Sequence, residues 1–444
     1  GLHAFGIHFH LGLNGVSAPL LAMGGFVGLA AGLTAIHSSA DRKPLYLALL
    51  AFMQSGLMGL FASVDIFFFY LFHEFALIPT FLMIGIWGGR DRKSVALEIT
   101  IYLTLGALIS LGGLVALNIM IGAGKFDFPT LAASIVNSGL GVGTQNKIFG
   151  LLLFGLGILV ALFPFHTWAP RGYESAPTPV SMLHAGVLKK FGLYGLIRLY
   201  PMVSAGMQDW LVWLIVLLLC NILWVGFVTI NQKRLDMILG NSSVMHMGYI
   251  FLAFAALIES GSFEANPLAK PAAVILMFAH GVSIALLFML TDTIRRKTGT
   301  VELAELGGLA KAAPRLAFLF GLAAMASIGL PGLANFSGEV LVFLSGFKSY
   351  NGESLGYVQT ATILALWGVV ISAVYMLRAY RQTFQGAPVS HTSSEHVKDF
   401  GPFCQIPAGI LALSLLIVGL YPNSLLQFLD EPEAVPSETE QASN

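Results

Sequence analysis

The sequence predicts an all-α polytopic membrane protein with about twelve transmembrane helices. Hydrophobic residues make up 56% of the 444 residues and charged residues only 10%, and the mean hydropathy is +0.79. This composition is typical of helical membrane proteins and not of soluble cores. The lysines and arginines are also distributed very unequally between alternate loops, which is the second observation that supports this fold class.

Twelve apolar stretches of about 20 residues, the length that spans a bilayer, are each bounded by charges or by glycine, proline or asparagine. They run over residues 17–37, 45–63, 66–88, 97–121, 147–169, 180–200, 209–231, 237–259, 271–293, 315–347, 359–381 and 405–421. We therefore expect a transmembrane domain over residues 17–421, which follows an N-terminal segment of residues 1–16. An acidic and disordered tail is expected over residues 422–444.

Two of the stretches are expected to be broken helices. The tenth is too long for one straight helix and contains IGLPGLANFSGE (Ile328–Glu339), and the fifth carries Pro164 and Pro170 near its end. Broken backbone at membrane depth is tolerated only where protein or a water-filled cavity surrounds it. Both breaks therefore indicate candidate ion paths and not lipid-facing surface.

The loop charges test this division of the chain. When alternate loops are assigned to the same side, sixteen lysines and arginines fall on one side and five on the other. Short loops rich in lysine and arginine stay in the cytoplasm, matrix or stroma. The side with sixteen is therefore the positive side, and both chain ends are expected on the opposite side.

The composition also excludes several classes of function. The formal net charge is zero, which gives no support to nucleic-acid binding. Cys220 and Cys404 lie in or next to apolar stretches, and the sequence contains no CxxC, HExxH, Walker or dinucleotide-binding motif. We therefore expect no cofactor and no metal site in this chain, so that any redox chemistry belongs to partner proteins.

Two lysines lie in the middle of an apolar stretch. Lys189 and Lys190 follow a loop broken by proline and glycine, and a charge near the middle of a bilayer costs on the order of 2.5–3.5 kcal/mol on insertion scales. Such residues are functional candidates by default, although a polar packing seam is the alternative. Adjacent helical residues differ by about 100° in direction, so both lysines cannot face the same partner. We take Lys190 as the main candidate, and Lys189 and His184 as subsidiary ones.

Glu74 is the first carboxylate candidate. It lies eight residues into the third stretch, in FFFYLFHEFALIPTF. Burial disfavours a charged glutamate and a charged lysine, whereas pairing favours both charged forms, so a pair whose separation changes is a proton switch. Glu74 and Lys190 can form such a pair only if their helices are neighbours, because helix axes pack about 8–10 Å apart. The alternative for Glu74 is a structural, hydrogen-bonded carboxylic acid.

Further titratable residues follow in the second half of the chain. His246 in NSSVMHMGY has Ser242 four residues earlier on the same face, His280 lies in the middle of MFAHGVS, and Glu339 lies in the broken tenth stretch. A histidine titrates near neutral pH and passes a proton through either ring nitrogen. Each histidine alone fits a packing role equally well, but together with the lysine and two glutamates they favour a chain of protonatable groups.

Several blocks between Leu11 and Pro422 resemble one family of membrane proteins. They read LGLNGVSAPLL, FHEFALIPTFLMIGIWGG, PFHTWAP followed by ESAPTP, HAGVLKKFGLYGLIRL, SSVMHMGYIFL, AHGVSIALLF and LPGLANFSGE. Together they resemble the antiporter-like membrane subunits of respiratory complex I and their Mrp antiporter and membrane-hydrogenase relatives, most closely the type called subunit M or chain 4. The resemblance implies fourteen helices with two inverted five-helix repeats, each containing one broken helix.

The resemblance implies roles for five residues. Glu74 matches the glutamate that faces the neighbouring subunit, and Lys190 matches the lysine of the GxLLK pattern. His246 and His280 match histidines of a central axis, and Glu339 matches a distal glutamate. The related subunits L and N usually carry lysine at that last position, so the glutamate favours the M type.

The chain departs from the family pattern in three ways. The family has a lysine five residues before the proline of PFHTW, where this chain has Leu159, and Lys189 is an additional lysine. The family's aspartate after the HTWLP block is Arg171, and the preceding leucine is Ala169. The first two family helices have no counterpart in this sequence. Loss of the usual lysine leaves open whether this chain pumps protons.

The resemblance implies a proton-translocating membrane-arm subunit of an NADH or ferredoxin:quinone oxidoreductase in an energy-converting membrane. We expect the bacterial inner membrane, with the mitochondrial inner membrane and the thylakoid membrane as alternatives. Protons would enter from the positive side around Lys190, pass along His246 and His280, and leave from Glu339. Its partners would be other membrane-arm subunits and membrane lipids. Two alternatives are an Mrp-type Na⁺/H⁺ antiporter or membrane-bound hydrogenase subunit, and a structural membrane-arm subunit that has lost transport, which Leu159 favours.

Overall fold

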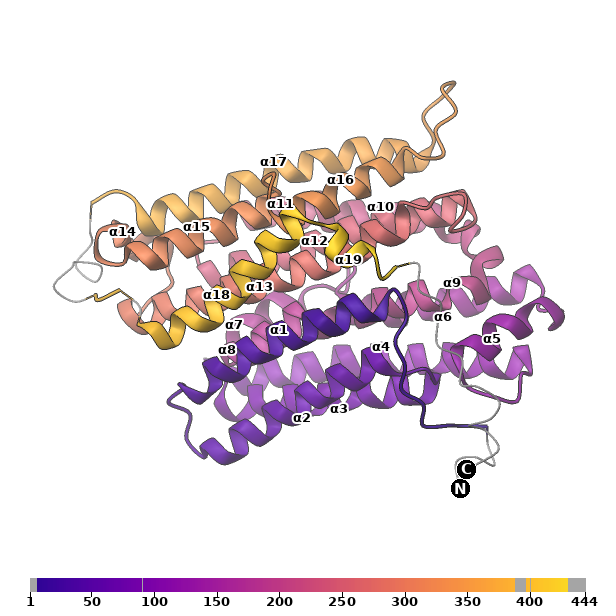
Figure 1. The fold of residues 1–444 in the computed structure, drawn as a ribbon, viewed down its shortest axis with the longest axis horizontal. Coiled ribbons are helices and arrows are strands. Elements are labelled where there is room, and N and C mark those ends of the chain that lie inside the picture. The colour runs from indigo at the N-terminus through magenta and orange to yellow at the C-terminus, as the bar shows by residue number, and fades with distance from the viewer. Residues whose placement is uncertain (1–5, 90, 388–396, 400, 430–444) are drawn as a thin grey trace.

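The computed structural model describes residues 6–89, 91–387, 397–399 and 401–429, and these residues are almost entirely helical (Figure 1). The helices are α1 (Ser17–Ile36), α2 (Lys43–Ala62), α3 (Ile66–Trp87), α4 (Arg92–Ile121), α5 (Phe128–Ser134), α6 (Val142–Val160), α7 (Trp168–Ser175), α8 (Thr178–Gly186), α9 (Phe191–Met207), α10 (Leu211–Leu219), α11 (Val225–Ile230), α12 (Leu235–Ser260), α13 (Ala269–Thr298), α14 (Leu309–Ala312), α15 (Pro314–Ile328), α16 (Ala334–Gly346), α17 (Tyr357–Phe384), α18 (Pro402–Leu420) and α19 (Asn423–Leu426). A 3₁₀ turn (Leu188–Lys190) joins α8 to α9, and a π turn (Cys220–Trp224) joins α10 to α11.

The helices agree with the twelve predicted stretches. By length and apolar composition, nine helical segments of the described residues are able to cross a membrane, and one of these is the 53-residue run Thr178–Ile230. This run contains two predicted stretches, which meet at the 3₁₀ turn Gln208–Trp210. The tenth predicted stretch consists of two shorter helices, α15 and α16, which are separated by a break, and the twelfth corresponds to α18.

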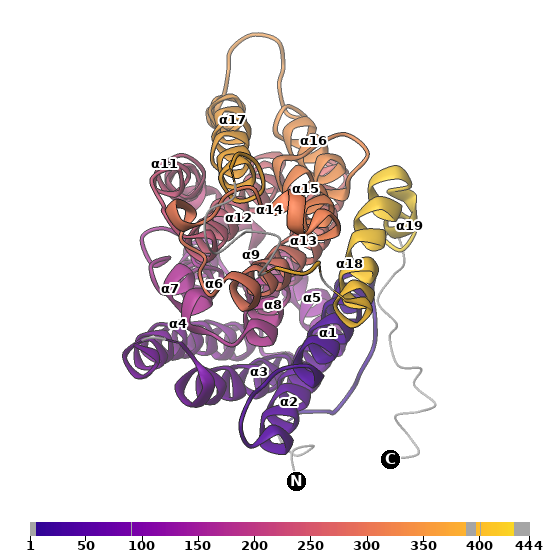
Figure 2. The ribbon, with the colours of Figure 1, turned by 90° about the vertical axis from the view of Figure 1, so that its left-hand side faces the viewer.

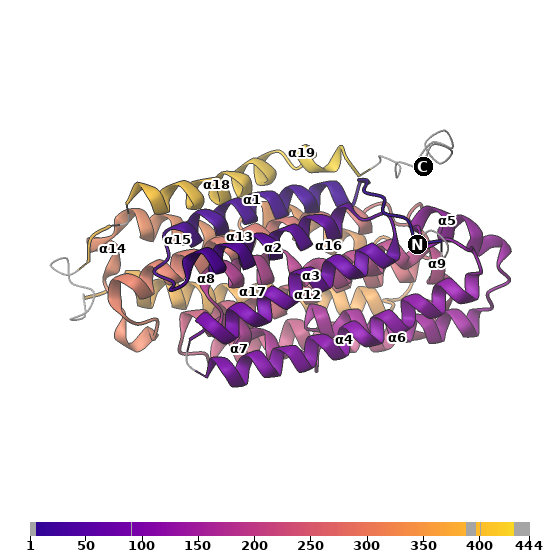
Figure 3. The same cartoon turned by 90° about the horizontal axis from the view of Figure 1, so that it is seen from below.

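The helices form a layered bundle around α12 and α13. Viewed along the bundle, α2, α3 and α4 lie on one side and α16 and α17 on the other, with α12 and α13 between them (Figure 2). The most apolar stretches of α12 and α13 are fully buried inside the protein. In the corresponding stretches of the outer helices α1 to α4 and α17, only 44% of the residues are buried. A helix that is apolar on all sides needs such surroundings, and the outer helices keep one face for lipid. Helix α18 packs along α1 at the edge of the bundle (Figure 3).

Two groups of five spans share one pattern. The first group comprises α2, α3, α4, α6 with α7, and α8 with α9, and the second comprises α10 with α11, α12, α13, α15 with α16, and α17. The fourth span is the broken one in both groups. The chain enters the first group at the positively charged end and the second group at the other end, so the groups are inverted. The predicted pair of broken helices is confirmed.

Polar side chains connect the loops at the positively charged end of the bundle. Arg234 contacts Glu174 at 3.1 Å and Glu302 at 3.1 Å, and Asp236 accepts a hydrogen bond from Arg295 at 2.6 Å. These residues come from α7, the start of α12, the end of α13 and the loop after α13. Their contacts agree with the predicted assignment of these loops to the same side of the membrane.

The first and last described residues, near His8 and Leu429, lie at the opposite end of the bundle. The amide of His8 donates to Asp65 at the start of α3 at 3.1 Å, and Lys270 donates to the carbonyl oxygen of Leu429 at 2.9 Å. The first residues of the predicted tail form the short helix α19. The rest of that tail, residues 430–444, lies outside the described residues, as do residues 1–5 of the N-terminal segment.

The first break lies between α6 and α7, and one asparagine of another span satisfies its backbone. Asn221, fully buried in the π turn, accepts a hydrogen bond from the amide of Phe163 at 2.7 Å. Its side-chain amide donates to the carbonyl oxygens of Ala161 and Val244, each at 3.1 Å. Trp168 donates to the carbonyl oxygen of Ile158 at the end of α6 at 3.1 Å. Free backbone groups at membrane depth are thus paired inside the protein, as the bilayer requires.

The second break lies between α15 and α16. Gly329 and Gly332 adopt positive φ values of +84° and +91°, a conformation that residues with a side chain rarely adopt. The amide of Gly329 bonds back to Ala326, which ends α15, and α16 begins again at Ala334. Because α15 stops here, its last carbonyl groups are free to accept hydrogen bonds from other helices.

We expect Asn221→Leu to lower the free energy of unfolding by about 2–4 kcal/mol. The substitution leaves the Phe163 amide and the Ala161 carbonyl without partners, and each buried unpaired group costs about 1–3 kcal/mol. The midpoint of thermal unfolding in detergent measures this loss. The control is Cys220→Leu at the neighbouring position, which leaves the three hydrogen bonds of Asn221 in place. Equal midpoints for the two variants would contradict the assignment.

Candidate functional site

A line of buried polar side chains runs through the middle of the bundle. Its members come from α3, α8, the turn before α9, α12, α13, α16 and α17. They are His73, His184, Lys189, Lys190, Ser242, Ser243, His246, His280, Glu339 and Tyr375, all of which are at most 5% exposed. Each polar group at this depth requires a polar partner, so their mutual contacts define the site.

The two lysines make different contacts. The Lys189 ammonium donates to the hydroxyl of Ser243 at 3.1 Å and lies 5.6 Å from the ring centre of Tyr173. The Lys190 ammonium donates to the carbonyl oxygen of Ala185 at 2.6 Å. The expectation that the two lysines face different partners agrees with these contacts. The short 3₁₀ turn Leu188–Lys190 rotates successive residues by about 120° and separates the two side chains.

The two histidines continue the line from Ser243. The Nε2 atom of His280 lies 3.2 Å from the Ser243 hydroxyl, and the rings of His280 and His246 are 5.3 Å apart. The Nδ1 atom of His246 lies 2.7 Å from the carbonyl oxygen of Ser242, and its Nε2 atom lies 2.9 Å from that of Ser327. Both nitrogens of His246 therefore face acceptors, and a proton on either nitrogen finds a hydrogen-bond partner.

The second broken helix supplies one of these acceptors. Ser327 is the penultimate residue of α15, and its carbonyl oxygen is one of the last four of that helix, which have no partner within the helix itself. His246 fills that position from α12. The break and the histidine are thus coupled directly, which the sequence pattern alone did not predict.

Glu339 lies beside the same break. A Cβ atom built on Gly329 would lie 2.2 Å from the Oε2 atom of Glu339, so the carboxylate packs against the glycine. Glu339 also interacts electrostatically with Tyr249 and Tyr375. The Tyr375 hydroxyl lies 2.7 Å from the hydroxyl of Ser242, the subsidiary candidate, which itself is 3.4 Å from His246 Nδ1. Tyr375 and Ser242 therefore connect the histidine to the region of the glutamate.

Glu74 lies at the other end of the line. Its side chain is 28% exposed on the outer helix α3, and its Oε1 atom lies 3.4 Å from Nδ1 of His73, within ion-pair distance but without hydrogen-bond geometry. His73 stacks on Phe191 at 4.1 Å. The His184 ring stacks on Trp168 at 5.3 Å and meets the ring of Tyr173, over which Lys189 lies, edge-on at 5.5 Å.

The sequence left open whether Glu74 pairs with Lys190. In the described part of the chain α3 contacts α8, but the Glu74 carboxylate lies next to His73 and the Lys190 ammonium bonds to Ala185. The predicted order of the histidines also differs from the contacts. We expected protons to reach His246 before His280. Instead, His280 contacts Ser243, the partner of Lys189, whereas His246 contacts Ser327 at the second break. Leu159 packs in the hydrophobic core.

Sequence reasoning missed four residues that connect or support this line: Ser243, Tyr375, Tyr173 and Asn221. Asn221 and Tyr375 are polar residues in apolar helices, Ser243 directly follows the candidate Ser242, and Tyr173 lies in the polar segment WAPRGYES without any such signal. A rule that marks every isolated polar residue in a predicted span would have found Asn221 and Tyr375. Their partners remain unknown without the fold, because they lie far apart in the sequence.

Two adjacent cavities, which share four lining residues, lie between the positive side and the lysines. A cavity of about 570 Å³ is lined by exposed Asp41 and Arg92 together with Glu174 and Arg295. A small cavity of about 10 Å³ shares Arg295 with it and is also lined by Tyr173, whose ring lies below Lys189. The line of buried side chains is therefore close to the positive-side surface at this point.

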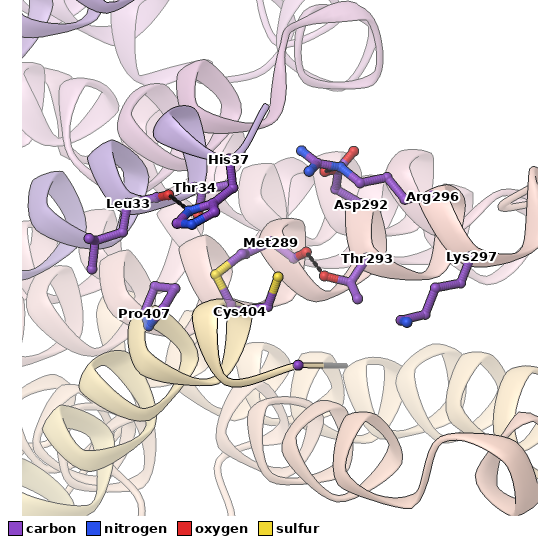
Figure 4. Close-up of a pocket in the computed structure, with 11 residues that line it drawn as sticks. Leu33, Thr34, His37, Met289, Asp292, Thr293, Arg296, Lys297, Cys404 and Pro407 are labelled. Carbon is purple, nitrogen blue, oxygen red and sulfur yellow. Dashed lines mark hydrogen bonds and ion pairs between the residues drawn. The ribbon is translucent and has the colours of Figure 1, made fainter. Parts of the chain in front are cut away.

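A third cavity of about 300 Å³ lies between α1, α13 and α18 (Figure 4). Next to Met289 and Cys404 its wall is apolar, and Arg296 at its rim is paired with Asp292 at 2.6 Å. None of the predicted site residues lines this cavity. In the described part of the chain, no group of three histidine, cysteine, aspartate or glutamate residues could hold a metal ion.

Comparison with known proteins gives a consistent family. The family model described as NADH:quinone oxidoreductase/Mrp antiporter, TM matches residues 63–365. NADH-quinone oxidoreductase subunit M of Rickettsia felis is 31% identical over 429 residues, which cover 96% of this chain and 82% of the relative. NAD(P)H-quinone oxidoreductase chain 4 1 of a Picosynechococcus species is 32% identical over 423 residues, which cover 94% and 76%.

Solved structures agree with these relatives. A chain of respiratory complex I from Thermus thermophilus matches with a TM-score of 0.86 and 27% identity over 97% of this chain and 86% of that chain. The Mrp complex of a Dietzia species has a chain with the same fold, with a TM-score of 0.77 at 20% identity over 97% and 85%. The predicted class, a polytopic helical membrane protein, is confirmed. The bacterial relatives also agree with the predicted location in a bacterial inner membrane.

The contact between Gly329 and Glu339 gives a matched pair of variants. We expect Gly329→Ala and Gly332→Ala each to lose about 1–2 kcal/mol of stability, because both glycines have positive φ. Gly329→Ala should lose more, since its Cβ displaces the Glu339 carboxylate, whereas the nearest atom to Cβ at Gly332 is 3.8 Å away. Thermal unfolding in detergent measures both.

A second substitution, Glu339→Ala, should remove the additional loss of Gly329→Ala. Equal losses for the two glycine variants, with no recovery in the double variant, would contradict the contact.

Proposed function

Because the chain belongs to the NADH:quinone oxidoreductase/Mrp antiporter family, we propose that it is a proton-translocating membrane-arm subunit of an NADH or ferredoxin:quinone oxidoreductase. The observation that carries the proposal is the line of hydrogen bonds from Lys189 through Ser243 to His280, whose ring lies 5.3 Å from the ring of His246. Lysine and histidine side chains gain and lose protons, and their burial excludes the bulk water that would short-circuit transfer.

The path begins at the positive side. Protons enter through the 570 Å³ cavity, reach the lysine pair, and pass to His280 and His246. Tyr375 and Ser242 then lead towards Glu339, from which the proton leaves on the opposite side. The Lys190 charge acts on His280 and His246 through space, since both histidines interact electrostatically with it.

Glu74 connects this subunit to its neighbour. Its partly exposed side chain lies on the outer helix α3, and His73 and His184 lead from it to the lysines. A change of charge next to Glu74 in an adjoining subunit would thus act on the lysines through two histidines. This arrangement supports other membrane-arm subunits as partners, with lipid covering the remaining apolar outer faces.

The electron-transfer chemistry belongs to other subunits in this proposal. The protonatable line contains the groups needed to move protons, and the relatives are named as subunits of NADH-quinone oxidoreductases. We therefore propose that this chain binds no cofactor and that redox energy reaches it through its contacts with partner subunits.

A structural membrane-arm subunit without transport is the second candidate. The apolar Leu159, buried in the core, favours it, because the family pattern has a lysine at this position. Proton translocation by the assembled complex distinguishes the two functions. An Mrp-type exchanger would instead show Na⁺-dependent proton exchange without any quinone or redox partner.

We expect Lys190→Met and Glu339→Gln each to abolish the proton translocation contributed by this subunit. Both substitutions remove a titratable group with little change in volume. Acidification of proteoliposomes that contain the assembled complex, measured with a pH-sensitive dye during quinone reduction, checks this outcome. Glu264→Gln, in an exposed loop, is the control and should translocate normally. Full translocation by intact complexes of both variants would reject the assignments.

A further inference from the structure

The two adjacent lysines differ in what their ammonium groups can pass on. Lys190 donates to a backbone carbonyl oxygen, Ala185 O, which carries no proton and accepts none at neutral pH. Lys189 donates to a hydroxyl group, that of Ser243, which both accepts and donates a hydrogen bond. Lys189 thus has a partner through which a proton can move on, whereas the hydrogen bond of Lys190 ends at a carbonyl group.

The Ser243 hydroxyl lies between Lys189 and His280. It is 3.1 Å from the lysine nitrogen and 3.2 Å from His280 Nε2. Ser243 is fully buried, so these two groups are the partners available to its hydroxyl. A single hydroxyl group therefore connects the lysine to the first histidine by two hydrogen bonds.

Lys189 is also the lysine next to the positive-side cavities. Its ammonium group lies over the ring of Tyr173 at 5.6 Å, and Tyr173 lines the 10 Å³ cavity together with Thr291. The hydroxyl groups of Tyr173 and Thr291 are both buried and have no hydrogen-bond partner among the residues that the structure describes. The cavity is about the size of one water molecule, which needs two or more polar partners, and these hydroxyl groups provide them.

The small cavity continues into the surface. It shares Ala176, Thr178, Asp292 and Arg295 with the cavity of about 570 Å³ at the positive side. Water held in the small cavity would be separated from the bulk by the larger cavity and from Lys189 by the ring of Tyr173. The Lys190 ammonium instead bonds to Ala185 in α8, and neither residue lines these cavities.

From this geometry we propose that Lys189 is the residue that takes up protons from the positive side and passes them through Ser243 to His280. The inference rests on the proposed function, proton translocation, and assigns the uptake step within it. Lys190 acts on the histidines through its charge and is not the direct donor. Thr291 and Tyr173 are positioning residues that hold water in the 10 Å³ cavity, which we call the uptake cavity.

Proton transfer from the cavity to His280 takes place in two steps. The neutral amine of Lys189 first accepts a proton from water in the cavity, and that water recovers a proton from the bulk. The ammonium group then gives one proton to the Ser243 oxygen as the serine hydroxyl proton moves to the unprotonated Nε2 of His280. Lysine returns to the neutral amine, serine is unchanged, and His280 carries the proton onward.

The decisive variants are Lys189→Met and Lys189→Arg in the assembled complex, reconstituted in proteoliposomes. Arginine keeps the positive charge but does not release its proton in proteins, whereas methionine keeps the volume without the charge. We expect both variants to assemble, to reduce quinone with NADH or reduced ferredoxin, and to lose the protons contributed by this subunit. A purely structural role for the charge predicts that Lys189→Arg translocates normally.

A matched pair of serine variants tests the bridge without changing either lysine. Ser243→Ala should abolish the same part of proton translocation, the part contributed by this subunit, as Lys189→Met. Ser283→Ala, which removes a buried hydroxyl that donates to the backbone carbonyl of His280, should translocate normally. This pair also keeps the proposal testable if a lysine variant fails to assemble.

The uptake cavity is tested by Thr291→Val with Thr293→Val as its control. Both are buried threonines of α13, but the Thr293 hydroxyl bonds within the helix to Met289. We expect Thr291→Val to slow proton uptake about fivefold to tenfold, the factor that corresponds to one hydrogen bond, and Thr293→Val to leave it unchanged.

The outcomes separate the two proposals. A wild-type complex that reduces quinone without acidification rejects the proposed function. A wild-type complex that acidifies, together with normal translocation by Lys189→Arg, Lys189→Met and Ser243→Ala, overturns the assignment of Lys189 and leaves the proposed function in place.

Discussion

The structure depends on how backbone groups are paired at the depth of the membrane. A bilayer offers no hydrogen-bond partners, so each interruption of a helix must find its partners within the protein. Asn221 provides them at the first break, through three hydrogen bonds to Ala161, Phe163 and Val244. His246 does so at the second, where it binds the carbonyl oxygen of Ser327.

The two breaks are not paired in the same way, and the difference bears on function. At the first, the partner is an amide that does not titrate under ordinary conditions, and the pairing is structural. At the second, the partner is an imidazole that gains and loses protons, with the Glu339 carboxylate packed against Gly329 at the same interruption. Protonation of His246 therefore changes a contact that supports the end of α15. The break between α15 and α16 is therefore in direct contact with two titratable side chains of the buried line, His246 and Glu339.

The burial of α12 and α13 makes this line possible. Neither helix faces lipid over its most apolar window, so Ser242, Ser243, His246 and His280 are surrounded by protein on every side. In such surroundings a small shift of one hydroxyl connects or disconnects two titratable groups, because no water competes for the hydrogen bond. The single hydroxyl of Ser243, between Lys189 and His280, is the clearest example.

The sequence alone determined the class of the protein, the positions of its spans, the two broken helices and the titratable residues among them. These follow from length, hydropathy and isolated charges, because a bilayer penalises each exposed polar group in a way that depends on local sequence. Only the tertiary structure decided which of these residues meet. Lys189 and Ser243 are 54 positions apart, and His246 and Ser327 are 81 apart. Contacts across such distances depend on helix packing and on a 3₁₀ turn that separates two adjacent lysines, and neither is encoded in the local pattern of any one span.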